Sequence, residues 1–239
     1  MPLAGSYASS TLWTEGEEIS DEYTLPPLKY GVTVDKNDEK VKATGDVTIN
    51  NNDPSDSWPI IGASGQGNKS FTLDMDGHSL TTGNRGFFIN FSGGNDNKVT
   101  ITNADNIVSN FHKVSSIFSW GKGHNISLDA KKNIELNKIE NDYSTSPIFV
   151  GDVDSFLSLS AGQDVVVTNG SVSRTIELNK SGKAEIHAGH DVILNQSYGM
   201  DPQYGTMEMI HAKNQSQLSI SANNDIRFNN KGVNRVVFG

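Results

Sequence analysis

The chain of 239 residues contains no cysteine, few basic residues and no long apolar run. Without cysteine it cannot form disulfide bonds, and a thiol nucleophile and cysteine metal ligands are excluded as well. No apolar run approaches the length of about eighteen residues that a membrane-spanning helix needs. Lysine and arginine number 19 against 28 acidic residues, a net charge of −9. This balance argues against a nucleic acid partner, which requires clustered basic residues.

Hydrophobic residues are also scarce, at 35%, and no stretch shows a sustained helical period. The sequence is instead rich in turn-forming residues, among them 23 glycines. This composition is low in apolar residues for a globular enzyme, but it suits an elongated protein with a thin core and much surface.

A short pattern recurs about every thirty residues from Val41 to the C-terminus, a period typical of stacked repeats. It reads apolar–x–apolar–x–Ala–x–x–(Asp/Asn)–apolar–x–apolar–x–Asn. The alanine-type position is filled by Ala43, Met75, Asn103, Ala130, Ala161, Ala188 and Ala222. Three positions later stand Asp46, His78, Asn106, Asn133, Asp164, Asp191 and Asp225. Seven positions after the alanine-type residue stand Asn50, Asn110, Asn137, Asn195 and Asn229, with Thr168 as a substitute.

Apolar and polar residues alternate on both sides of the alanine-type position, which predicts two half-buried strands per copy. A third apolar segment lies between copies, as in Phe87–Phe91 and Ile117–Trp120. A unit of three short strands cannot bury its inward face alone, whereas stacked units bury a continuous core. The sequence therefore predicts an all-β fold, a parallel β-helix (solenoid) of about seven three-strand coils.

The domain division follows from the extent of the repeat. Residues 1–40 lie outside it and predict an N-terminal cap, because the first coil of a solenoid needs covering. Residues 41–239 form the solenoid. The chain stops in a strand at Gly239, so we expect the natural protein to continue.

The recurring Asn and Asp residues have a structural interpretation, because Asx side chains bond the backbone at tight corners. Asn50, Asn110, Asn137, Asn195 and Asn229 then predict a turn ladder that runs along one corner. A ligand role for these stacked side chains is the alternative.

Three longer loops interrupt the coils, and insertions in solenoids often lie on the binding side. They are Asn51–Gly67, Asn141–Pro147 and Gln196–Gly205. Tyrosine and tryptophan are favoured at interfaces, so the loop aromatics are the candidate binding residues. These are Trp58, Tyr143, Tyr198 and Tyr204. Packing beneath the loops is the alternative role for each.

Several segments resemble known families. FTLDMDGHSL (Phe71–Leu80), GFFIN (Gly86–Asn90) and VTITN (Val99–Asn103) resemble β-helical passenger domains of bacterial type V autotransporters. AGQDV (Ala161–Val165) and AGHDVILN (Ala188–Asn195) are similar to filamentous haemagglutinin repeats. The resemblance covers about residues 40–239 and implies a right-handed β-helix that is exported and displayed as an adhesin. The Asn-Pro-Asn motifs of the two-partner secretion branch do not occur in the sequence, so the single-chain branch is favoured.

Such an adhesin would bind a host surface protein or glycan, or copies of itself on neighbouring cells. The resemblance implies a location at the cell surface, with membrane attachment only through a C-terminal translocator that this sequence does not include. A role as stalk or cap, with binding located elsewhere in a longer protein, is a further alternative.

Parallel β-helices also include polysaccharide lyases and glycoside hydrolases, which is the alternative function. Hydrolysis needs two carboxylates across the scissile bond. Asp74 with Asp76 and Asp152 with Asp154 are the candidate pairs, and turn or edge positions are the structural interpretation. Gly123-His124-Asn125 is similar to the Gly-His-Gly of polygalacturonases, but the companion motifs are absent from the sequence. We therefore expect no catalytic residues and no enzyme activity.

Two features of the sequence are candidate metal sites. His187 and His190 straddle one corner, and Gly93–Asp96 resembles part of a calcium-binding repeat without recurring. Neither is a complete ligand set, so we expect no metal and no cofactor.

Overall fold

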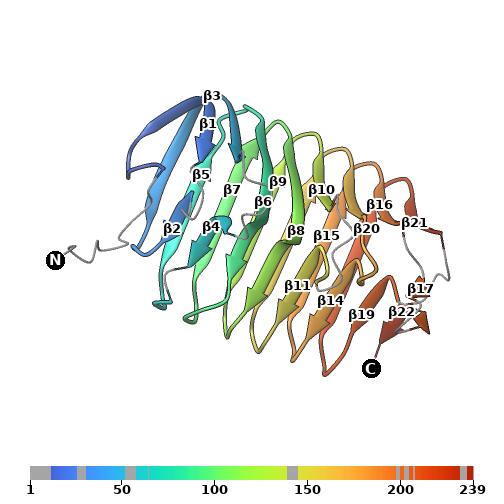
Figure 1. The fold of residues 1–239 in the computed structure, drawn as a ribbon. Coiled ribbons are helices and arrows are strands. Elements are labelled where there is room, and N and C mark those ends of the chain that lie inside the picture. Colours follow the sequence, from blue (N-terminus) through green and yellow to red (C-terminus); the bar gives the residue numbers. More distant parts are fainter. Residues whose placement is uncertain are drawn as a thin grey trace.

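The computed structural model describes residues 12–25, 31–51, 58–63, 65–138, 145–197, 200–201, 205–206, 208–231 and 236–238. Throughout these residues the regular structure is β-strand. A helix of the length and apolarity that crossing a membrane requires is not found among them. Twenty strands belong to one sheet system that winds into a solenoid (Figure 1). The expected all-β parallel solenoid of about seven coils is confirmed.

Each coil contributes a strand to each of three faces, and strands within a face pair in parallel. Face A stacks the first part of β3 (Glu39–Asn51), β5 (Ser70–Asp74), β7 (Lys98–Ala104), β9 (Asn125–Ala130), β12 (Phe156–Ala161), β15 (Lys183–Ala188) and β20 (Gln217–Ala222). Face B stacks β1 (Glu18–Leu25), the second part of β3, the first parts of β6 (Leu80–Phe91) and β8 (Ile107–Trp120), β10 (Ile134–Lys138), β13 (Val165–Asn169), β16 (Val192–Gln196) and β21 (Ile226–Asn230). Face C stacks β2 (Val32–Val34), β4 (Pro59–Ala63), the second parts of β6 and β8, β11 (Ile148–Gly151), β14 (Ile176–Asn179), β19 (Ile210–Ala212) and β22 (Val236–Phe238). Outside the stack, β17 (Met200–Asp201) and β18 (Gly205–Thr206) form a small antiparallel pair.

The N-terminal region adds strands to the same stack. β1 pairs in parallel with β3, and β2 pairs in parallel with β4. Just before β1, Trp13 is buried, and its ring stacks 6.4 Å from Phe71 while Tyr23 meets it edge-on at 6.2 Å. The described residues before residue 40 thus extend the parallel stack by β1 and β2 and add Trp13 to its core.

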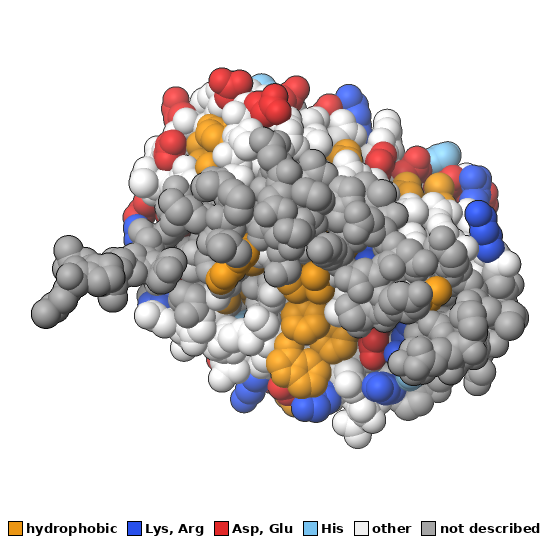
Figure 2. All heavy atoms as spheres, viewed as in Figure 1, with side chains coloured by type: hydrophobic (Ala, Val, Ile, Leu, Met, Phe, Trp, Pro, Cys, Tyr) orange, Lys and Arg blue, Asp and Glu red, His pale blue; other side chains and the backbone are white. Residues whose placement is uncertain are grey.

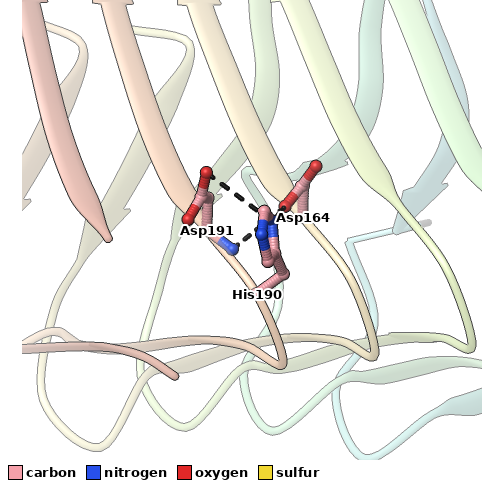
Figure 3. A group of neighbouring side chains, drawn as sticks. All are labelled: Asp164, His190 and Asp191. Carbon is pink, nitrogen blue, oxygen red and sulfur yellow. Dashed lines mark hydrogen bonds and ion pairs between the residues drawn. The ribbon is translucent and has the colours of Figure 1, made fainter. Parts of the chain in front are cut away.

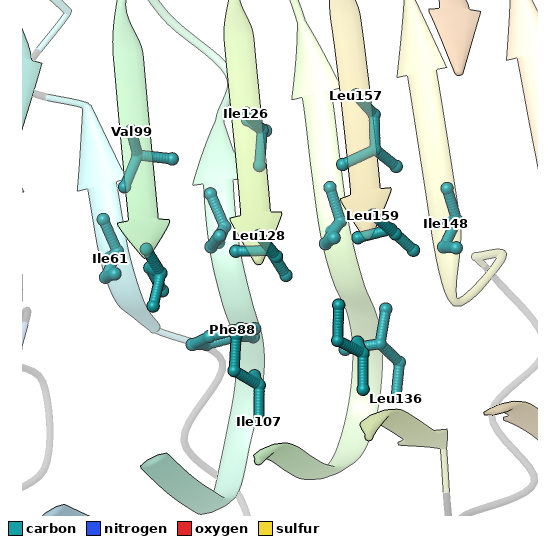
Figure 4. Packing of buried hydrophobic residues seen from close by; sticks show 14 of the residues in the cluster. Ile61, Phe88, Val99, Ile107, Ile126, Leu128, Leu136, Ile148, Leu157 and Leu159 are labelled. Carbon is teal, nitrogen blue, oxygen red and sulfur yellow. The ribbon is translucent and has the colours of Figure 1, made fainter. Parts of the chain in front are cut away.

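The core consists of vertical columns of apolar side chains, which the strict alternation within each strand points inward (Figure 4). Val99, Ile126 and Leu157 occupy one column of face A in successive coils, and all three are fully buried. Full burial of such a side chain stabilises the folded state by about 1.5–3 kcal/mol. Because the contribution repeats in every coil, the solenoid can be stable despite its low apolar content.

The alanine-type residues mark the corner between faces A and B. Ala130, Ala161, Ala188 and Ala222 are direct partners in adjacent coils. The space there is tight: a Cβ on Gly189 would lie 2.1 Å from the carbonyl oxygen of Gly162 in the coil before it. Small residues are required at this corner because the backbones of successive turns nearly touch.

The second and third copies deviate from the predicted alignment at this corner. Ala104, not Asn103, is the partner of Ala130, because an extra residue shifts the register after Ile101. Asn103 adopts a left-handed conformation with φ of 55°, which asparagine tolerates well. In the second copy Ser79, not His78, lies in the Asx column, because its N–H bonds the carboxylate of Asp46.

The Asx residues of this corner bond the backbone of the next coil. The Asn106 side-chain oxygen accepts the N–H of Asn133, and that of Asn133 accepts the N–H of Asp164. The series continues from Asp164 to Asp191 and from Asp191 to Asp225. These side chains therefore act as vertical connectors between successive coils.

The predicted asparagine ladder lies on the outer side of face B, close to the ends of its strands. Asn137 donates to the side-chain oxygen of Asn110 at 3.1 Å, and Asn229 donates to that of Asn195 at 2.9 Å. Between these pairs Asn195 donates to the hydroxyl of Thr168 at 3.3 Å. Asn50 stands apart and donates to Glu22 at 2.9 Å.

The interruption after Asn50 has a simple cause, which is Gly83 in the same column of the second coil. A Cβ on Gly83 would lie 3.5 Å from Oδ1 of Asn50 and 3.8 Å from the carbonyl oxygen of Asn110, both ordinary contacts. We predict that Gly83→Asn joins Asn50 to Asn110 and raises the free energy of unfolding by about 1 kcal/mol, the net contribution of one hydrogen bond. Urea unfolding would measure this increase. Gly83→Ala is the control for the removal of glycine alone, and a Gly83→Asn variant no more stable than Gly83→Ala would contradict the prediction.

Candidate ligand-binding surface

The predicted insertions Asn141–Pro147 and Gln196–Gly205, and the first part of Asn51–Gly67, occur at one corner of the solenoid. The prediction of one loop over Asn51–Gly67 is wrong in its second part, because Pro59–Ala63 form strand β4 of face C. Each insertion leaves the end of a face-B strand and returns at the start of a face-C strand: from β3 to β4, from β10 to β11, and from β16 to β19. Since the coils are stacked in register, the ends of these strands align along a single edge. The edge between faces B and C is therefore where the repeat has been elaborated.

Partly exposed aromatic side chains lie across face C, from Phe87, which pairs with the first residue of β4, to Trp120 at the end of β8. We call Phe87, Phe118, Trp120 and Phe149 the aromatic strip. Phe118 and Phe149 stack with ring centroids 4.9 Å apart and an interplanar angle of 17°. Phe87 meets Phe118 at 6.0 Å, and Trp120 lies 5.7 Å from Phe149. Figure 2 shows a continuous hydrophobic area on this side of the molecule.

The strand alternation explains why Phe118 and Phe149 face outward. Phe118 follows the buried Ile117, and Phe149 lies between the buried Ile148 and Val150. The parallel register makes Phe118 and Phe149 direct partners in adjacent coils. Their separation therefore matches the spacing of about 4.8 Å between neighbouring strands, at which aromatic rings can stack.

Trp120 lies against the backbone of the next coil because its partner there is Gly151. A Cβ on Gly151 would approach ring atoms of Trp120 at 2.8 and 3.0 Å. The glycine thus leaves the space that the indole occupies. The ammonium group of Lys180 lies 4.5 Å from the indole centroid, a cation–π contact.

Next to the strip lies a group of charged side chains, Arg174, Glu177, Glu208 and His211, which we call the ionic cluster. Glu177 is the partner of Phe149 in the next coil, and His211 is the partner of Glu177 in the coil after that. Arg174 contacts Glu208 at 3.2 Å through Nε and Glu177 at 3.4 Å through Nη1. The outward column of face C therefore changes from aromatic to polar between the coils of β11 and β14.

The ionic cluster is half-buried, and this burial affects its protonation. Burial alone would raise the pKa of Glu208, but its own backbone N–H and Arg174 outweigh that effect and hold the pKa below the ordinary value. Burial, reinforced by Arg174, lowers the pKa of His211. At neutral pH the cluster therefore combines a guanidinium, an ionised Glu208 and an uncharged imidazole.

The sequence pointed to loop aromatics and not to this strip. Trp58 is partly buried and directly precedes Pro59, which pairs with Phe87 of the strip. Tyr143, Tyr198 and Tyr204 lie outside the described residues. A signal for the strip was present in the sequence, because Phe87, Phe118 and Phe149 follow one another at intervals of 31 residues.

A second group of titratable side chains lies at the corner between faces A and B. Nδ1 of His190 lies 2.8 Å from Oδ1 of Asp164 and 3.6 Å from Oδ2 of Asp191 (Figure 3). Arg227 contacts the same Asp191 oxygen at 3.2 Å and Asp225 at 2.7 Å. The hydrogen bond from His190 to Asp164 raises the pKa of the imidazole.

His190, Asp164 and Asp191 offer one imidazole nitrogen and two carboxylate oxygens within 4.8 Å of one another. Such groups commonly serve as ligands of a transition metal. However, Asp164 and Asp191 already bond the backbone of the next coil, and Arg227 neutralises Asp191. A cation would have to displace this guanidinium. His187, the other half of the predicted histidine pair, contacts the hydroxyl of Ser221 instead.

The two candidate carboxylate pairs are engaged in local turn contacts. Asp74 accepts the N–H of Asp76 and the side-chain amide of Asn103, both at 3.0 Å. Asp152 accepts the N–H of Val153, and both Asp152 and Asp154 have left-handed backbones, with φ of 79° and 60°. These positions match the turn interpretation of the pairs.

Comparisons with protein family models, with curated proteins and with solved structures find no match to this chain.

His124, singled out in the sequence, is fully buried against Phe91, with ring centroids 5.2 Å apart. Its Nδ1 accepts the N–H of Asn97 at 3.2 Å. Burial lowers its pKa below the ordinary value of 6.5, against an opposing effect of Asp96. Protonation of His124 therefore favours the unfolded chain. The contribution of neutral His124 to the free energy of unfolding is fully present above pH 6.5 and decreases as the pH falls towards the pKa of the folded state.

We predict that His124→Asn, which keeps an acceptor for Asn97, removes part of the acid sensitivity. Each unit by which the folded pKa lies below the unfolded one corresponds to about 1.4 kcal/mol lost at low pH. Urea unfolding of both proteins between pH 7 and pH 5 would measure the difference. Parallel pH profiles of the two proteins would contradict this role of His124.

Proposed function

We propose that this chain is part of the passenger of a surface-displayed autotransporter adhesin, which mediates bacterial adhesion, self-aggregation or biofilm formation. The supporting observation is the position of the aromatic strip. It is partly exposed, it adjoins the ionic cluster, and both lie on face C, whose strands follow the predicted insertions. Insertions and partly exposed aromatic side chains on one surface are typical of a binding protein.

The solenoid suits this role mechanically. A stiff stack of coils holds side chains at a fixed spacing and presents them along an extended face. The parallel solenoid is also the architecture that the resemblance to autotransporter passengers implies. Export, display at the outer membrane and a contribution to virulence form part of the proposal and rest on that resemblance, which is an analogy.

A polysaccharide hydrolase or lyase is the alternative, and the ionic cluster is where its carboxylates would be sought. A general acid needs a raised pKa, whereas the pKa of Glu208 is lowered. Glu177 and Glu208 also share the guanidinium of Arg174. This arrangement favours recognition over proton transfer.

The proposal predicts that beads coated with residues 1–239 adhere to epithelial cells or to one another several-fold more than beads coated with a Phe118→Ser/Phe149→Ser variant. The reason is that the double change removes the centre of the exposed strip while the inward core residues remain. Adhesion would be counted by microscopy, and circular dichroism would verify that the variant is folded.

Two results would contradict the proposal. One is the absence of adhesion both to cells and between beads. The other is turnover of an acidic or neutral polysaccharide in a reducing-sugar or unsaturated-product assay, which would establish the enzymatic alternative.

A further inference from the structure

We infer that the aromatic strip and the ionic cluster together form a binding site for a neutral oligosaccharide built of pyranose rings. This inference rests on the proposed function and specifies its ligand. It identifies Trp120, Phe149 and Glu208 as the principal contact residues.

The apolar half of the site can accept sugar rings. Pyranose rings present C–H bonds on their faces, which are attracted to the negative π-cloud of an aromatic ring. Trp120 lies over Gly151, and its ring centroid is 5.7 Å from that of Phe149 with 32° between the ring planes, so the two rings form one apolar platform across adjacent coils. The ammonium group of Lys180, 4.5 Å from the indole centroid, borders this platform. The stacking of Phe149 on Phe118 fixes the orientation of this platform before any ligand arrives.

The polar half supplies the hydrogen bonds that hydroxyl groups require. A hydroxyl both donates and accepts. Glu177 and Glu208 are acceptors with lone pairs to spare, and the guanidinium of Arg174 has five N–H donors, of which the contacts to the two carboxylates involve Nε and Nη1. Glu177 is the direct partner of Phe149 in the next coil, so the hydrogen-bonding groups of the ionic cluster lie immediately beside the aromatic rings. A ligand that is apolar on its ring faces and polar at its rim matches this arrangement.

The charge distribution selects a neutral glycan over other partners. Within the site the two carboxylates, Glu177 and Glu208, are balanced by Arg174 and by Lys180, which lies over Trp120. The site therefore carries no net charge of its own, while the chain as a whole carries −9, which disfavours the approach of a sulfated or uronate-rich polymer. A protein partner would have to bury the ion pairs of Arg174 in an interface core, from which charged residues are normally depleted. A neutral sugar can bond these charged groups while they stay partly hydrated.

The test begins with purified residues 1–239 on an array of neutral, sialylated, sulfated and uronate-containing oligosaccharides. We expect binding to neutral members, followed by calorimetry with the strongest of them. Trp120→Ala and Phe149→Ala should each weaken binding by about tenfold or more, as expected for the loss of one stacking ring. The matched control is Phe156→Ala, because Phe156 is a partly exposed phenylalanine on face A.

A second variant guards against misfolding of the alanine variants. Gly151→Ala retains every aromatic ring, but its methyl group would meet the indole of Trp120 at 2.8 Å and displace it. We expect weaker sugar binding at an unchanged melting temperature. Glu208→Gln should also weaken binding, because a carboxylate is a stronger acceptor than an amide.

The outcomes separate this inference from the proposed function. Adhesion that persists on cells whose glycans have been oxidised with periodate, with no signal on the array, would overturn the glycan site and leave the adhesin proposal standing. Binding only to acidic glycans, or binding that Trp120→Ala and Phe149→Ala do not change, would also overturn it. Loss of both adhesion and sugar binding in the same strip variants would support both.

Discussion

The structure depends on one constraint, the parallel in-register pairing of each strand with its equivalent in the next coil. This pairing satisfies the backbone hydrogen bonds of every interior strand and places equivalent residues directly above one another. The consequence is visible in Ala130, Ala161 and Ala188, which are direct partners at one corner. A residue that fits its position therefore stabilises the fold again in each coil of a column, and a residue that does not fit destabilises it again in each coil.

The same in-register pairing also aligns polar residues on the surface in columns, where they form hydrogen bonds between coils. At the corner between faces A and B, Asn133, Asp164 and Asp191 each accept a backbone N–H from the following coil. On face B, Asn110 and Asn137 bond each other side chain to side chain. These contacts join successive coils without adding to the core, which is consistent with a hydrophobic content of only 35%.

The fold could be predicted from the sequence because alternation and a period near thirty residues are local signals that a solenoid repeats many times. Details that depend on a single residue could not. The register shift that puts Ala104 opposite Ala130 depends on Asn103 adopting a positive φ, and nothing in the repeat pattern distinguishes this from direct alignment.

The candidate site was missed for a related reason. The prediction of loop aromatics such as Trp58 as binding residues follows the general rule that insertions in a solenoid often lie on its binding side. Phe118 and Phe149 instead stand in regular strands, where an aromatic residue is usually attributed to the core. Only the combination of strand alternation and register shows that they point outward and stack on each other. The charged neighbours come from still farther along the chain, since Arg174 and Glu208 are 34 residues apart.

The vertical alignment of coils can be measured directly, because the chain has no cysteine and engineered cysteines would be the only spin-labelled sites. Thr100 and Glu185 lie in one column of face A, separated by three coil steps, and Thr72 and Ser219 lie in the same column, separated by five. Pulsed electron resonance on the two double-cysteine variants should give distances that differ by about two strand spacings, or roughly 10 Å. Equal distances, or a shorter distance for the pair farther apart in sequence, would contradict the stacked solenoid on which this account rests.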